Sequence, residues 1–282
     1  MTAPIPPVQP GFLLVCTDGS AASQGAVEAA LVLARRWSSR LLLLQVLEYN
    51  SGFASLAIDS IKEWEEEARK GLQVLGNRAR ALGLEADIMI VQGEAAHRVI
   101  LAEAEKHRPD LIIMGRRGRS DLASVLMGSV TARVVAASSV KVLIVPRKAP
   151  LTFQRLLVAH DGSPCSNGAW REALAMSRDR FCYLLAVAVA RKAGAVPEFQ
   201  GIMLKLQGEA DRQGIPLDAL VLRGIPEAAI LQAAKARGAD LLILGSRGRS
   251  GLSRFLLGSV AEQVIGKASC PVLVVRGPAN KV

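Results

Sequence analysis

The sequence predicts an α/β protein built from two doubly wound, five-stranded parallel sheets. The first observation is an internal repeat: "LLVCTDGSAASQGAVEAAL" (13–31) aligns without a gap with "LLVAHDGSPCSNGAWREAL" (156–174). Further on, "LIIMGRRGRSDLASVLMGS" (111–129) aligns with "LLILGSRGRSGLSRFLLGS" (241–259), with 11 of 19 positions identical, where chance gives about one. A length of 282 residues suits two domains. We therefore expect one domain over residues 1–150 and a second over 151–282.

The second observation is the alternation of short apolar runs with helix-period segments. In copy one we expect strands at 12–17, 40–47, 86–91, 110–115 and 140–145, and helices at 20–37, 57–82, 94–107 and 129–138. The strands are continuous Val, Leu and Ile runs, as in sheets that are covered on both faces. Copy two repeats the pattern from about residue 155. It is shorter, mainly opposite residues 48–70, where "EWEEEARK" predicts a solvated acidic helix face. This segment also raises the hypothesis of a lid over the first site, whose absence from copy two would make the two sites unequal.

Composition excludes several classes of protein. No apolar run approaches the roughly 20 residues that span a bilayer. The N-terminal "MTAPIPPVQPG" has no basic region followed by an apolar one, as a secretory signal would. We therefore expect a cytoplasmic protein without membrane contact. Four cysteines form no CxxC pair and no metal-ligand spacing, so reduced thiols, mostly in the core, are expected.

The net charge of +10 favours an anionic partner such as a nucleotide, a phosphorylated ligand or a nucleic acid. The basic residues are scattered, however, and aromatic residues make up only 4% of the chain. No stacking platform for bases is visible. A solvated basic surface is therefore the simpler explanation of the charge, and a nucleic-acid partner is disfavoured.

Glycines follow the fourth strand of each copy, at the sheet edge where open α/β folds bind ligands. Gly115 and Gly118 permit positive φ or a close backbone approach to a ligand. Gly128 and Ser129 begin the next helix, whose free N–H groups and dipole suit phosphate. Arg117 adds positive charge to the loop. This pattern predicts a phosphate site.

Asp18 and Asp161 end the first strand of each copy, inside Asp-Gly-Ser. A carboxylate there can accept hydrogen bonds from ribose or hold a divalent cation. Helix capping by Ser20 or Ser163 alone would also explain the motif. Two such segments at one sheet edge, in both copies, favour the ligand site. GxxxxGK[ST] and GxGxxG are both absent, so neither a P-loop NTPase nor a dinucleotide-binding dehydrogenase is supported.

The spacing G-x2-G-x9-G-[ST] resembles the ATP-binding signature of the universal stress protein family. The companion features are the Asp-Gly-Ser segment and the closing runs "VKVLIVP" (140–146) and "CPVLVVR" (270–276). The resemblance covers nearly the whole chain. It implies the strand order 3-2-1-4-5 in each copy, ATP as the ligand, and Mg²⁺ as its companion at Asp18 or Asp161.

The resemblance also implies the residues of each nucleotide site. Copy one would use Thr17, Asp18, Val46, Gly115, Arg117, Gly118, Gly128, Ser129, Val130 and Thr131. Copy two would use His160, Asp161, Val189, Gly245, Arg247, Gly248, Gly258, Ser259 and Val260. In each set the aspartate would contact ribose and the glycines would hold phosphate. Val46 and Val189, at the end of the second strand, would meet adenine through their backbone.

Copy two departs from the pattern at two positions. Ala261 replaces Thr131 and His160 replaces Thr17, so each position lacks one hydroxyl and copy one is predicted to be the better site. His160 beside Asp161 also raises the hypothesis of a general base. With one histidine and no partner, an ordinary loop side chain is the simpler interpretation.

Function follows from the predicted site. The leading hypothesis is an ATP-binding stress-response regulator. The sequence offers no water-activating residue and no P-loop lysine, so we assign no catalytic residue and expect at most slow ATP hydrolysis. One alternative is a nucleotide-free binding scaffold of the same fold. Another is a polyanion or nucleic-acid binder, which would show strongly salt-dependent retention.

The last strands, "VLIV" (142–145) and "VLVV" (272–275), would be unpaired apolar edges in isolated domains. We expect the two copies to pair through these strands as an intramolecular pseudo-dimer. The sequence leaves open whether whole chains also form a homodimer.

If the last strands pair, charged substitutions at Val142 and Val272 should break the contact between domains, which small-angle X-ray scattering would register as an extended chain. An intact fold and an intact domain contact in these variants would contradict the pairing.

Overall fold

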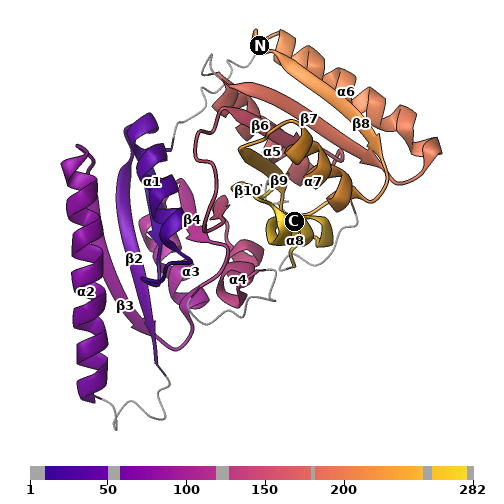
Figure 1. Cartoon of the computed structure of the whole chain (residues 1–282). Coiled ribbons are helices and arrows are strands. Elements are labelled where there is room, and N and C mark those ends of the chain that lie inside the picture. The colour runs from indigo at the N-terminus through magenta and orange to yellow at the C-terminus, as the bar shows by residue number, and fades with distance from the viewer. Residues whose placement is uncertain (1–9, 50–57, 119–126, 179–181, 250–255, 278–282) are drawn as a thin grey trace. The chain divides into compact units, whose positions relative to one another are not determined.

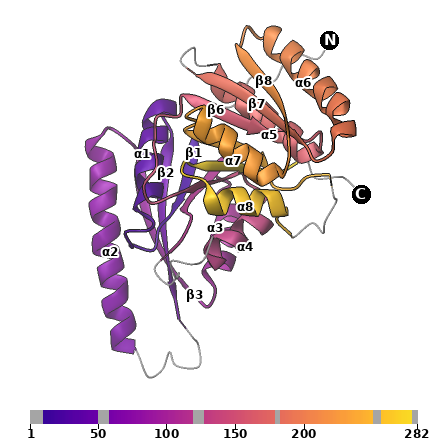
Figure 2. The same ribbon diagram turned by 45° about the vertical axis from the view of Figure 1, so that its right-hand side comes forward.

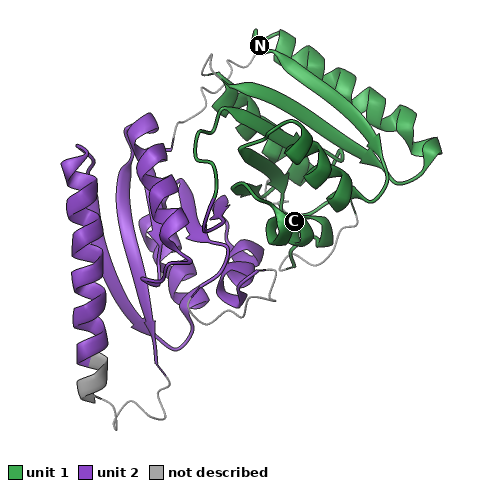
Figure 3. Ribbon diagram, viewed as in Figure 1, with its two compact units in different colours: residues 1–9, 149–282 green, residues 10–148 purple. Residues whose placement is uncertain are grey.

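The computed structural model describes residues 10–49, 58–118, 127–178, 182–249 and 256–277. It divides into two compact units (Figure 3). In the order of the chain, we call residues 10–148, drawn purple, unit one and the chain from residue 149 onward, drawn green, unit two; the colour key of Figure 3 numbers them the other way round. Each unit contains one copy of the sequence repeat, so the tandem organisation is confirmed. Within the described ranges, no helix is both long and apolar enough to cross a lipid bilayer.

Both units alternate strands and helices (Figure 1). Unit one, residues 10–148, contains β1 (Phe12–Cys16), α1 (Gln24–Trp37), β2 (Arg40–Glu48), α2 (Ile58–Ala81), β3 (Ala86–Gly93), α3 (Ala96–His107), β4 (Leu111–Gly115), α4 (Ser129–Ala137) and β5 (Val142–Val145). Unit two, from residue 149, contains β6 (Arg155–Ala159), α5 (Pro164–Ser177), β7 (Tyr183–Ala190), the 3₁₀ turn η2 (Ala193–Ala195), α6 (Val196–Asp211), β8 (Leu217–Arg223), α7 (Pro226–Ala236), β9 (Leu241–Gly245), α8 (Ser259–Lys267) and β10 (Val272–Val275).

Every strand pair within a unit is parallel, in the order β3-β2-β1-β4-β5 in unit one and β8-β7-β6-β9-β10 in unit two. The predicted order 3-2-1-4-5 is confirmed in both. Because the order reverses between β1 and β4, α1 and α2 cover one face of the first sheet and α3 and α4 the other (Figures 1 and 2). Leu13, Leu14 and Val15 of β1 are consequently 0% exposed, and each contributes roughly 1.5–3 kcal/mol by burial.

The two units match residue by residue through their strand registers. Leu41 pairs with Ala86 in unit one, and Leu184 pairs with Leu217 in unit two. The offset between copies is therefore 143 in the second strand and 131 in the third. The helix between them has 24 residues in α2 and 16 in α6. Copy two thus lacks the first two turns of this helix and part of the preceding connection, as the sequence predicted.

The start of α1 differs from the prediction. The sequence suggested a helix from residue 20, but α1 begins at Gln24. Ser20 instead bonds Asp18 Oδ1 through its backbone N–H (3.0 Å) and its hydroxyl (2.7 Å), which makes a local turn before the helix. The hypothesis that Ser20 caps the helix is therefore wrong. In unit two Ser163 does cap α5, since its hydroxyl oxygen accepts from the N–H of Ser166 at 3.2 Å.

Thr17 and His160 perform the same structural task in the turn after the first strand. Thr17 Oγ1 accepts the N–H of Gly19 at 3.1 Å, and His160 Nδ1 accepts that of Gly162 at 3.2 Å. Both glycines have positive φ, 75° and 85°, which residues with a side chain rarely adopt. Because Nδ1 accepts, the imidazole proton lies on Nε2 and is donated to Asn167 Oδ1 at 3.0 Å. His160 is thus a buried turn acceptor in its neutral form.

This arrangement predicts acid sensitivity of unit two. Burial, only partly offset by the Asn167 hydrogen bond and the nearby Asp161, lowers the pKa of His160 below its usual 6.5. The unfolded chain then binds the proton more readily than the folded chain, so stability decreases as pH falls below about 6.5. We expect weaker hydrogen-exchange protection of β6 at pH 5 than at pH 7.5, and His160→Thr should remove that difference. An equal pH response in wild type and variant would contradict this role.

Candidate functional site

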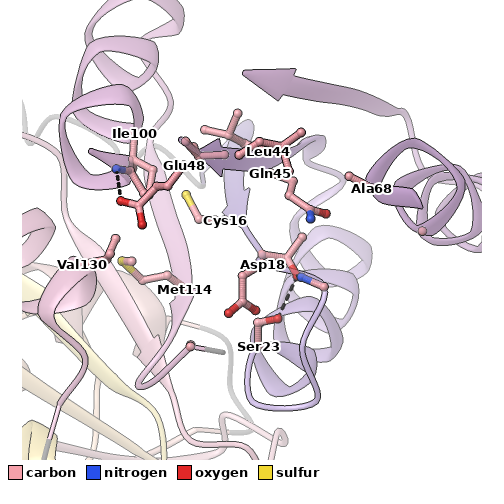
Figure 4. Close-up of a pocket in the computed structure, with 18 of the residues that line it drawn as sticks. Cys16, Asp18, Ser23, Leu44, Gln45, Glu48, Ala68, Ile100, Met114 and Val130 are labelled. Carbon is pink, nitrogen blue, oxygen red and sulfur yellow. Dashed lines mark hydrogen bonds between the residues drawn. The ribbon is translucent and has the colours of Figure 1, made fainter. Parts of the chain in front are cut away.

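A cavity of about 780 Å³ opens in unit one at the carboxyl ends of β1, β2 and β4 (Figure 4). Its volume lies within the usual range of small-molecule sites. All ten residues predicted for the first nucleotide site line it: Thr17, Asp18, Val46, Gly115, Arg117, Gly118, Gly128, Ser129, Val130 and Thr131. The reversal of strand order thus brings together residues that are far apart in the sequence.

The first two signature glycines are required by close approaches. A Cβ on Gly115 would lie 3.2 Å from the carbonyl oxygen of Ala22, and one on Gly118 would lie 2.8 Å from Asp18 Oδ2. Neither glycine has positive φ. Positive φ, one of the two roles that the sequence suggested, is therefore not used, and the close approaches found here are to the protein's own atoms. The predicted approach to a ligand stays a prediction.

The start of α4 presents backbone donors to the cavity. Gly128 is the N-cap residue and has no side chain to accept the first-turn N–H groups. Its own N–H donates to the carbonyl of Arg116 at 2.9 Å, which holds the end of the loop. Ser129 and Val130 of the first turn line the cavity. Thr131 donates its hydroxyl to the carbonyl of Gly115 at 2.9 Å, so this hydroxyl ties α4 to β4.

Arginine side chains add positive charge to the same wall. Arg117 lines the cavity, and its buried Nε has no hydrogen-bond partner among the described residues. Burial and, to a lesser degree, the charge of Arg117 lower the pKa of the Arg116 guanidinium. An anion bound between Arg117 and the α4 N-terminus would satisfy the Nε and meet the positive end of the helix dipole.

Asp18 is the carboxylate that lies beside the glycine loop, and Glu48 and Glu67 also line the cavity. Its Oδ1 accepts both bonds from Ser20, and its Oδ2 lies against Gly118. In the described ranges, no cluster of three His, Cys, Asp or Glu side chains is arranged to hold a metal ion. Asp18 is the carboxylate that would hold Mg²⁺ beside the phosphates of a bound nucleotide.

The contribution of Gln45 on β2 was not predicted from the sequence. Gln45 is 7% exposed and points from β2 toward Ala68 of α2 in Figure 4. It lines the cavity, and its amide group can both donate and accept hydrogen bonds. The available signal was its position as the polar residue within the apolar run "LLLLQVL". Glu48, further along, accepts the N–H of Ala96 at 2.6 Å and so supports the start of α3.

The helix α2 forms a further wall. The sequence predicted a solvated acidic face here and raised the hypothesis of a lid over the site, and one side of the helix lines the cavity through Trp64, Glu67, Ala68, Lys70, Gly71 and Val74. Ala68 and Gly71 are the small members of this wall, one turn apart. They leave space where larger side chains would fill the cavity.

Cys16 is the thiol that lines the cavity. Burial raises its pKa to about 12, so it stays protonated at neutral pH and is a poor nucleophile. The four cysteines are all buried, which confirms their predicted position in the core.

Unit two repeats the frame of this site. The residues predicted for it stand at the matching strand ends and helix start: His160, Asp161, Val189, Gly245, Arg247, Gly248, Gly258, Ser259 and Val260. A Cβ on Gly245 would lie 2.7 Å from the backbone of Cys165, and one on Gly248 would lie 2.6 Å from Asp161 Oδ2. The same close approaches therefore explain the glycines of both copies.

Comparison with known proteins agrees with this frame. The model of the universal stress protein family matches residues 13–146 and 152–276. A universal stress protein of Methanocaldococcus jannaschii is 31% identical over 145 residues, covering 46% of this chain and 85% of that protein. One of Mycolicibacterium smegmatis is 27% identical over 290 residues, covering 94% of this chain and 96% of its own.

The fold is also found among solved structures. The crystal structure of a universal stress protein from Archaeoglobus fulgidus covers 94% of this chain and 96% of its own, with a TM-score of 0.77 and 24% identity. The repeat, the strand order and both family matches lead to one conclusion. The chain belongs to the universal stress protein family and contains two tandem domains of it.

Proposed function

We propose that this protein binds ATP in the cavity of unit one and acts as a nucleotide-dependent regulator of a stress response. The observation that carries the proposal is the meeting of three features in one cavity. These are the uncapped N-terminus of α4, the unpaired Nε of Arg117, and the carboxylate of Asp18. Together they provide donors for phosphate and an acceptor for hydroxyl groups.

The nucleotide would lie across the carboxyl edge of the sheet. The triphosphate takes the N–H groups of the first turn of α4 and the guanidinium of Arg117. Asp18 accepts from the ribose hydroxyls, and the adenine lies along the end of β2 at Val46, where Gln45 adds an amide. Mg²⁺ accompanies the phosphates and supplies charge neutralisation there.

The described lining residues favour binding over turnover. Asp18 is held by Ser20, Glu48 by the N–H of Ala96, and the Cys16 thiol is protonated at neutral pH. None of these groups is arranged as a base for water. A regulator whose state follows its bound nucleotide, with at most slow hydrolysis, fits this chemistry best. The pairing of the last strands and a homodimer of whole chains remain predictions.

The direct test is calorimetric titration of nucleotide-free protein with ATP and Mg²⁺. We expect saturable binding, and steady-state phosphate release that stays slow. Adenosine and GTP in parallel titrations separate the phosphate and base contributions. Absence of heat, in protein purified without bound nucleotide, would contradict the proposal and favour a nucleotide-free scaffold.

Substitutions in the loop separate the parts of the site. Arg117→Gln removes a charge-assisted phosphate contact, so ATP affinity should fall about tenfold, which corresponds to about 1.4 kcal/mol. Adenosine affinity should not change. Gly118→Val drives a side chain into the Asp18 carboxylate and should weaken both ligands. Equal loss of ATP and adenosine binding in Arg117→Gln would exclude the phosphate role of Arg117.

A further inference from the structure

We propose that unit two does not take a nucleotide, because its own side chains occupy the matching site, and that each chain therefore binds one ATP, in unit one. This inference rests on the proposed function and decides which of the two signature loops serves it. Both loops carry the full glycine spacing, so the difference lies in what packs against them.

The helices α2 and α6 can be matched residue by residue. At their ends, Leu84 N–H donates to the carbonyl of Ala79 at 3.1 Å, and Ile215 N–H donates to that of Ala210 at 3.0 Å. The offset of 131 here equals that of the following strands. Both helices are continuous, so Ala68 corresponds to Phe199 and Gly71 corresponds to Ile202.

The side chains at these two positions are small in unit one and large in unit two, and their size determines access to the site. In unit one Ala68 and Gly71 line the open cavity. In unit two a phenyl ring and a branched aliphatic chain stand in their place. Phe199 is buried, at 7% exposure. Ile202 reaches the turn after β6, since a Cβ on Gly162 would lie 3.0 Å from its Cδ1.

Arg249 of the second loop closes the remaining space. Its Nε donates to the backbone carbonyl of Asp161, its Nη1 lies 2.7 Å from Glu198 Oε1, and its guanidinium lies 4.8 Å from the centre of the Phe199 ring. We call these contacts the Arg249 latch. The latch joins the loop to α6 beside Asp161, in the space that the ribose and phosphates of a nucleotide would occupy.

The packed side chains contribute more to this closure than the ion pair does. Arg249 and Glu198 are 40% and 58% exposed, so solvent screens their attraction. Phe199 and Ile202 would have to be displaced from their packing, whereas Glu198 corresponds to Glu67 of the unit-one cavity and does not distinguish the two sites. Size at positions 199 and 202 is therefore the determinant, and Arg249, which corresponds in sequence to Arg119 of the first loop, adds to the closure seen in unit two.

Reciprocal exchange of these residues tests the inference. Wild-type protein should bind one ATP. Ala68→Phe with Gly71→Ile should reduce binding in unit one at least tenfold. Phe199→Ala, Ile202→Gly and Arg249→Ala together should raise the stoichiometry from one to two. Gln73→Phe and Leu204→Ala, on exposed positions of the same helices, serve as matched controls and should change nothing.

The outcomes separate this inference from the proposed function. No binding to wild type contradicts the proposed function itself. Two ATP per wild-type chain would overturn the inference and leave the proposed function standing. A single site that is abolished by Gly248→Val and spared by Gly118→Val would do the same. A folded triple variant that still binds one ATP overturns the role of the three residues. If that variant does not fold, hydrogen exchange of wild type decides: ATP should protect α4 and not α8.

Discussion

The contact between the aspartate that ends the first strand and the glycine loop that follows the fourth organises both units. Asp18 Oδ2 and Asp161 Oδ2 would lie only 2.8 and 2.6 Å from a Cβ on Gly118 and Gly248. Only glycine lets the loop pass the carboxylate at that distance. The loop is then held at its far end, where Gly128 N–H donates to the carbonyl of Arg116. With both ends set, the N-terminus of the next helix has to face the crevice.

Several residues of the signature serve the scaffold before they serve a ligand. Gly115 is needed where β4 passes the backbone at Ala22, and the hydroxyl of Thr131 binds the carbonyl of Gly115. The groups left for an anion are the backbone donors of α4 and the side chain of Arg117. A complete signature is therefore evidence for the loop conformation. Ligand binding depends in addition on the walls around it.

The turn after the first strand has the same hydrogen-bonding geometry in both copies, although the residues that form it differ. A threonine hydroxyl in unit one and an imidazole nitrogen in unit two accept the same glycine N–H, at 3.1 and 3.2 Å. The backbone N–H groups of Ser20 and Ser163 both donate to the preceding aspartate at 3.0 Å, but the Ser20 hydroxyl also donates to Asp18 whereas the Ser163 hydroxyl caps the helix. The frame of the turn tolerates these exchanges because a single acceptor at the right distance is sufficient for it.

The sequence by itself determined the tandem repeat, the strands and, through the family resemblance, the strand order and the ten lining residues of unit one. These were accessible because strand ends and loops follow from local apolar runs and glycine spacing. The sequence placed the start of α1 too early, since the bonds between Ser20 and Asp18 compete with the first helical turn. The amide of Gln45 and the small residues Ala68 and Gly71 were missed. Only the tertiary structure decided which side of α2 faces the crevice, because that depends on packing between elements distant in sequence.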